Sequence, residues 1–137
     1  YYALYYNMLH EITQKIGESS FIHCDMFLMR ERDSNLVKKM IYQKNDLLNE
    51  FGTKQLDILE KFIIDASPKM IIVPNAMVSE IYRDKYTNKN IVDGVYYSNI
   101  NNKKIPTLLC GSWQYGRLDV FTKEILIYHI KRILREI

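Results

Sequence analysis

The sequence predicts an α/β fold in which helices flank a small, mostly parallel sheet. Three observations support this class: apolar runs short enough for strands, helix-periodic segments between them, and a length of 137 residues that suits one core. The clearest run is Lys69–Val73, whose last four residues are all apolar, as is typical of a strand buried on both faces. We therefore expect residues 1–137 to form a single α/β domain.

The first half of the chain predicts three helices and one strand. Apolar residues at helical spacing predict a first helix that ends at Gly17. This helix begins without an initiator methionine or a cap, so we expect residues to be missing upstream of Tyr1. The other elements expected here are a buried strand over Phe21–Met29, a short helix from Ser34 to about Tyr42, and a helix from about Asp46 to Ala66 that Gly52 breaks.

In the second half, Pro68 marks the boundary before the strand Lys69–Val73. The elements expected after this strand are a helix from Asn75 or Ser79 to about Tyr86, a strand over Val92–Ser98, a polar turn over Asn99–Lys104, a buried strand over Ile105–Cys110, a loop over Gly111–Leu118, and an amphipathic helix from Asp119 or Thr122 to Ile137. This alternation of strands and helices favours the α/β class.

The charge is mildly basic, which allows a polyanion partner without requiring one. The net charge is +3 and the pI is about 8.8. Nucleic-acid-binding domains typically have a pI above about 9. A solvated surface of mixed charge is the simpler interpretation. Cys24 and Cys110 lie in apolar runs, where we expect buried free thiols. With no signal peptide and no apolar stretch near the roughly 18 residues of a membrane span, we expect a cytoplasmic protein without a membrane partner.

Several catalytic classes have no motif in this sequence. It contains no P-loop, no G-x-G-x-x-G and no G-x-S-x-G, so nucleotide triphosphate hydrolysis and serine-hydrolase chemistry are not indicated. His10, His23 and His129 lack the spacing of metal ligands. We expect neither a metal nor a cofactor.

Candidate ligand-binding residues follow the strands of the predicted sheet, because ligands of parallel α/β sheets bind outside the carboxyl ends of the strands. Asp25 is suited to act as a base or to read an exocyclic amine, and Arg30 or Arg32 to bind phosphate. A solvated loop is the alternative for these residues. Asn75 is suited to present its amide to a ligand, to cap the following helix, or to do both.

The loop Gly111–Leu118 has the residue types of a nucleic-acid contact. Its candidate ligand-binding residues are Ser112, Trp113, Gln114, Tyr115 and Arg117. Glycine permits a close backbone approach, aromatic rings stack on bases, and arginine pairs with phosphate. The alternative is structural, with Trp113 in the core and Arg117 paired with Asp119 or Glu124.

The order of these segments resembles the later part of the uracil-DNA glycosylase-like fold. The residues that carry the resemblance are the run Phe21–Arg32, the segment Ser67–Ala76 after a long helix, and Pro106–Ser112 before the closing helix. In that superfamily a Pro-Lys-hydrophobic strand leads into a turn of small residues, and the last strand ends in the loop that carries the DNA-probing residues. The resemblance implies a three-layer sandwich and a role in DNA repair.

Three departures from the family pattern bear on its chemistry. The water-activating motif lies on a first strand that would precede Tyr1, the His-Pro of the second motif is replaced at Cys110 and Gly111, and the base-reading asparagine has no equivalent near Asp25. The resemblance thus implies a DNA- or nucleobase-binding domain, either as part of an enzyme or as a relative with altered chemistry. Two other functions stay open: a protein-interaction domain with a surface drawn from the eleven tyrosines, and a small-molecule hydrolase that uses Asp25.

Overall fold

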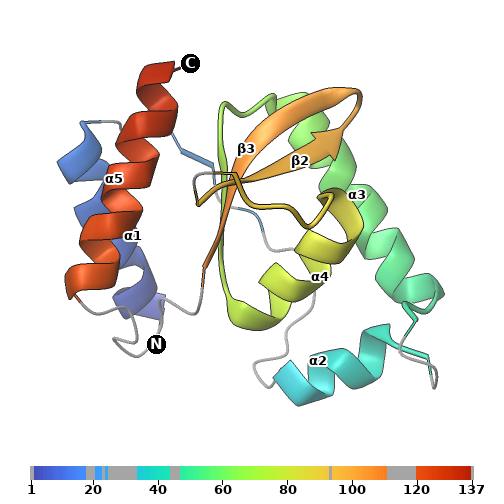
Figure 1. Ribbon diagram of the computed structural model, residues 1–137. Helices are drawn as coiled ribbons and strands as arrows, with labels where there is room; N and C mark the ends of the chain where they lie inside the picture. The colour runs from blue at the N-terminus through green and yellow to red at the C-terminus, as the bar shows by residue number, and fades with distance from the viewer. Residues whose placement is uncertain are drawn as a thin grey trace. The chain divides into compact units, whose positions relative to one another are not determined.

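The computed structural model describes residues 2–17, 21–22, 24, 34–43, 47–92, 94–110 and 120–136 (Figure 1). Its elements, in chain order, are α1 (Tyr2–Ile16), α2 (Ser34–Ile41), α3 (Glu50–Ala66), β1 (Ile71–Pro74), α4 (Ala76–Tyr86), β2 (Tyr96–Ile100), β3 (Lys103–Cys110) and α5 (Val120–Glu136). The chain divides into two compact units. The first unit is Tyr1–Phe21 with Pro68–Ile137, and the second unit is Ile22–Ser67.

The first unit contains a three-stranded sheet in the order β1-β3-β2. β1 pairs with β3 in parallel, with Ile71 opposite Thr107, whereas β2 pairs with β3 in the antiparallel sense, with Tyr96 opposite Thr107. The α/β class is therefore confirmed. The sheet is mixed among the described strands, so a mostly parallel sheet is not confirmed.

β2 and β3 are joined by a tighter turn than the sequence predicts. Asn101 and Asn102 have φ of +52° and +61°, and positive φ at both central positions is the mark of a two-residue type I′ hairpin. The expected polar turn over Asn99–Lys104 is wrong because its outer residues pair with each other, Asn99 opposite Lys104. Asparagine makes this tight turn possible since its side chain tolerates the left-handed region.

Apolar side chains of α1 and α5 form the main core of the first unit, and the two helices lie side by side (Figure 1). The buried members of this cluster are Ile12, Val95, Leu108, Leu126, Ile127, Ile130 and Ile133. At the edge of the cluster, Lys123 Nζ donates to both carboxylate oxygens of Glu11, at 3.1 and 2.9 Å. The helices predicted at the two ends of the chain are confirmed, and the first ends as expected at Gly17, whose φ is +72°.

The second unit is organised by the junction between α2 and α3. Asn49 caps α3, because its Oδ1 accepts a hydrogen bond from Gly52 N at 2.8 Å while its Nδ2 donates to Met40 O at 2.7 Å. A Cβ on Gly52 would lie 2.8 Å from Ile41 O. Gly52 therefore allows α2 and α3 to approach closely. The helix break that the sequence suggested at Gly52 does not occur, because α3 continues through it. The cap also explains why α3 begins at Glu50 and not at Asp46.

The buried strand expected over Phe21–Met29 is wrong for the residues that can be described. Phe21, Ile22 and Cys24 belong to no strand, and Phe21 and Ile22 are 52% and 69% exposed. His23 and residues 25–29 lie outside the described part of the chain. A short apolar run forms a strand only when another strand is available to complete its backbone hydrogen bonds. The run itself does not reveal whether such a partner exists.

Candidate functional site

The strongest candidate site is the sheet edge where β1 and β3 both end. The register places Pro74 opposite Cys110, so these parallel neighbours finish side by side. α4 starts two residues after β1 and presents its N-terminus at this edge (Figure 1). We call this place the ligand edge, because the carboxyl ends of parallel strands are where α/β sheets bind ligands.

Asn75 lies at the ligand edge and caps α4. Its backbone is extended, with φ of −153°, and its Oδ1 accepts a hydrogen bond from Val78 N at 3.1 Å. The predicted capping role is confirmed. Among the described residues the amide nitrogen of this half-buried side chain has no hydrogen-bond partner, and the amide carries two N–H groups that can donate.

Ser79 ties the ligand edge together. Its buried Oγ lies 3.1 Å from Val73 O and 3.0 Å from Cys110 O, so a single hydroxyl proton is shared between the carbonyls of two neighbouring strands. This bond fixes the ends of β1 and β3 to the first turns of α4. The sequence suggested Ser79 only as an alternative helix start, because a serine near a helix N-terminus is usually a cap.

A chain of buried hydroxyls connects α4 to the sheet. Tyr82 OH lies 2.8 Å from Ser98 Oγ, which in turn contacts Thr107 Oγ1. Thr107 Oγ1 donates to Ile105 O at 2.9 Å, and since its only proton is used there, Ser98 must donate to Thr107 and Tyr82 to Ser98. Burial raises the pKa of Tyr82 to about 12, so the phenol stays protonated. This network is a rigid support for α4 and has no access to a substrate.

The remaining predicted site residues lie outside the described part of the chain. They are Asp25, Arg30, Ser112, Trp113, Gln114, Tyr115 and Arg117. In the sequence, the last five follow Cys110, the final residue of β3. Of the predicted ligand-binding residues, the structure therefore describes Asn75, and it places Asn75 where the sequence predicted.

Metal and thiol chemistry find no support in the described residues. Within them, no group of three His, Cys, Asp or Glu side chains is arranged to hold a metal ion. Cys24 and Cys110 form no disulfide, as expected, but both are only partly buried, where the sequence predicted buried thiols. Burial raises the pKa of Cys110 to about 12, which keeps it a neutral thiol and therefore a poor nucleophile. No helix in the part of the chain searched is long and apolar enough to cross a membrane.

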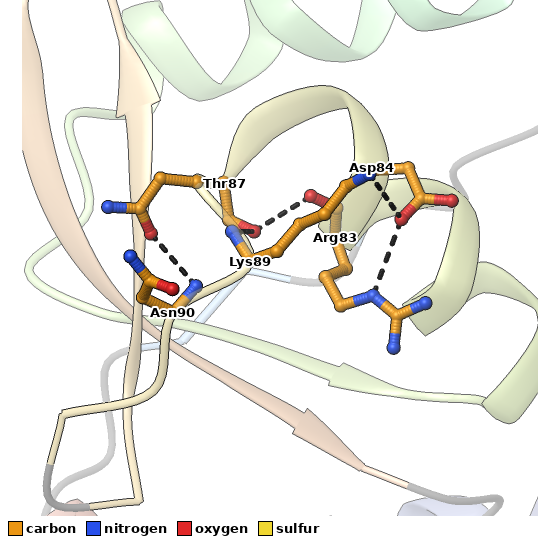
Figure 2. A network of polar contacts seen from close by, with 6 residues as sticks. Arg83, Asp84, Thr87, Lys89 and Asn90 are labelled. Carbon is orange, nitrogen blue, oxygen red and sulfur yellow. Dashed lines mark hydrogen bonds and ion pairs between the residues drawn. The ribbon is translucent and has the colours of Figure 1, made fainter.

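A polar network closes the far end of α4 (Figure 2). Thr87 Oγ1 donates to Arg83 O at 2.7 Å and accepts from Lys89 N at 3.1 Å, while Thr87 also forms an antiparallel bridge with Ser98. Asp84 accepts a hydrogen bond from Arg83 Nε at 3.4 Å and lies 3.9 Å from Lys89 Nζ. The segment after α4 is thereby held beside β2, with its lysine partly neutralised.

Comparison with protein-family models, with curated proteins and with solved structures found no match. The function of the ligand edge is therefore argued from its own geometry and chemistry.

Proposed function

We propose that this chain is a nucleic-acid-binding α/β domain that takes a nucleobase and its phosphate at the ligand edge, similar to uracil-DNA glycosylases. The observation that carries the proposal is the joint formed by Ser79, which holds the ends of two parallel strands and the N-terminus of α4 together. In the sequence, the segment that contains Trp113 and Arg117 follows β3. Asn75 supplies amide donors at the ligand edge, and α4 supplies the positive end of its dipole.

The distribution of charge supports a polyanion as the ligand. The first unit contains twelve lysines and arginines against eight aspartates and glutamates, while the second unit contains seven against eight. The whole basic excess therefore belongs to the unit that contains the ligand edge. Phosphate contacts by such residues supply most of the affinity in sequence-independent binding.

The proposal includes a three-layer, glycosylase-like arrangement of the first unit. Support comes from the two sides of β3, since Thr107 belongs to the hydroxyl chain with α4 whereas Leu108 belongs to the core cluster with α1 and α5. Adjacent residues of a strand point to opposite faces of a sheet. The free state of both cysteines agrees with a reducing compartment, and we propose that the protein acts in the cytoplasm on DNA.

In the proposed mode of binding, the base leaves the stack before it is read. Trp113 or Tyr115 stacks on the extruded base, Asn75 donates to its edge, and Arg117 holds the adjacent phosphate. No described residue is assigned here as a catalytic base, so the proposal concerns binding and not turnover.

The test is fluorescence anisotropy with uracil-containing, abasic and undamaged duplexes at several salt concentrations. We expect preference for a damaged duplex, affinity that falls with salt, and a salt slope that Arg117→Ala lowers by about one unit. Arg135→Ala is the matched control, since Arg135 is exposed near the end of α5. Equal affinity of the Arg117 variant and the control would remove the loop from the binding site.

A protein-interaction domain is the second candidate. It is favoured by Phe51, Ile58 and Phe62, which lie seven and four residues apart on one side of α3 and are 41%, 48% and 36% exposed. Sedimentation over a range of concentrations tests its simplest form, self-association of the chain. A monomer at every concentration that also binds DNA would favour the first candidate.

A further inference from the structure

The β2–β3 hairpin presents an exposed aromatic ring near its turn. Along β2, Ser98 and Ile100 are buried, whereas Tyr97 is 37% exposed and Asn99 is exposed. Because side chains alternate along a strand, Tyr97 and Asn99 share one face of the sheet. Lys104 of β3 pairs with Asn99 and lies on that same face.

Two exposed lysines lie at this end of the hairpin. Lys104 shares the face of Tyr97 and Asn99, whereas Lys103 pairs with buried Ile100 and lies on the opposite face. No carboxylate of a described residue lies within ion-pair distance of Lys104. From Lys85 to Cys110 the sequence contains four lysines and one acidic residue, Asp93. We call the set Tyr97, Asn99 and Lys104 the hairpin surface.

We propose that the hairpin surface binds single-stranded nucleic acid, with the Tyr97 ring stacked on a base and Lys104 in contact with a phosphate. An exposed ring beside an exposed cation is the arrangement that single-strand binders use. Asn99 adds a donor and an acceptor between the ring and Lys104. A protein partner fits this surface less well, because lysine is depleted from protein–protein interfaces.

This inference rests on the proposed function and extends the bound strand beyond the ligand edge. Lys104 and Cys110 are six residues apart on β3, which at about 3.3 Å per residue separates the hairpin surface from the ligand edge by about 20 Å. That distance is spanned by about six nucleotides at about 3.4 Å each. A strand whose base enters the ligand edge can thus reach the hairpin surface without a second molecule.

The experiment measures the anisotropy of a fluorescent oligothymidylate titrated with the full chain at several salt concentrations. The variant Lys104→Gln is expected to lower the salt slope by about 0.7, the contribution of one phosphate contact to a single strand. Tyr97→Leu is expected to weaken binding about tenfold with an unchanged slope, since it removes one stacked base. The control Lys61→Gln removes the same charge from an exposed position of α3 and should change affinity less than about twofold.

The outcomes separate this inference from the proposed function. Hairpin variants that bind like the control overturn the inference, and if Arg117→Ala still weakens binding, the proposed function stands. Weakening by the hairpin variants with no effect of Arg117→Ala supports the hairpin surface and removes the ligand edge. A chain that binds no oligonucleotide overturns both. Tighter binding of duplex than of single strand, with the lysine effect confined to duplex, overturns the assignment to single strands. Thermal unfolding of each variant establishes that the fold is retained.

Discussion

The buried hydroxyl chain predicts a specific loss of stability when Tyr82 becomes phenylalanine. The ring is 2% exposed, and the change keeps its packing while it removes the proton donated to Ser98. Ser98 can still donate to Thr107, so one hydrogen bond is lost and one buried acceptor is left unsatisfied. Such a loss costs about 1 to 2 kcal/mol.

The free energy of unfolding, measured by urea denaturation of the full chain, tests this value. We expect a lower midpoint for Tyr82→Phe with an unchanged m-value. Tyr128→Phe is the matched control, because Tyr128 is 62% exposed and its ring contact with His129 survives the change. A Tyr82 variant as stable as the control, within about 0.5 kcal/mol, would refute the proton assignment along the chain.

Three further predictions follow from the same structure. Burial raises the pKa of Tyr82 to about 12, so the unfolded state ionises first and Tyr82 should cost the wild-type chain on the order of 3 kcal/mol of stability between about pH 10 and pH 12. Urea titrations at alkaline pH should show that Tyr82→Phe removes this contribution. Gly52→Ala should destabilise the chain by about 1 to 3 kcal/mol, although alanine has the better helix propensity, because the new methyl group would meet Ile41 O. A raised thermal midpoint, measured by circular dichroism, would contradict the close approach of Ile41 to Gly52. The pKa of Glu11 is lowered, chiefly by its hydrogen bond to Lys123, so the ionised carboxylate stabilises the fold at neutral pH and this stabilisation is lost as the pH falls through the lowered pKa. Glu11→Gln should therefore lower the thermal midpoint at neutral pH. A difference between variant and wild type that persists in strong acid would exclude the ionised carboxylate as its cause.

Local sequence signals were sufficient for most elements of the fold. Helical spacing and a glycine stop predicted α1, and the apolar run after Pro68 predicted β1. Asn75 was expected as a cap and is one. These features depend on a few consecutive residues, so their physics is contained in a short stretch of sequence.

The features that the sequence did not predict depend on pairing between distant segments. Ser79, Ser98 and Thr107 are polar, and the register of β3 brings all three into buried hydrogen bonds whose partners no local pattern reveals. Glycine within a helical pattern is typical of a helix break, but Gly52 lies inside α3, where Ile41 O leaves no space for a Cβ. Neither register nor helix approach can be derived from local pattern, because each is set by the packing of the whole unit.

The central claim is that a nucleic-acid ligand contacts the ligand edge, and the most direct measurement is the NMR signal of the Asn75 side-chain amide. We would titrate the labelled chain with a uracil-containing oligonucleotide and follow this signal together with the backbone amides of Val73 and Val78. The account predicts that the Asn75 amide shifts in a saturable way while the Oδ1 bond to Val78 N is kept. Saturable shifts elsewhere in the chain, with the Asn75 amide and its neighbours unchanged, would contradict the claim.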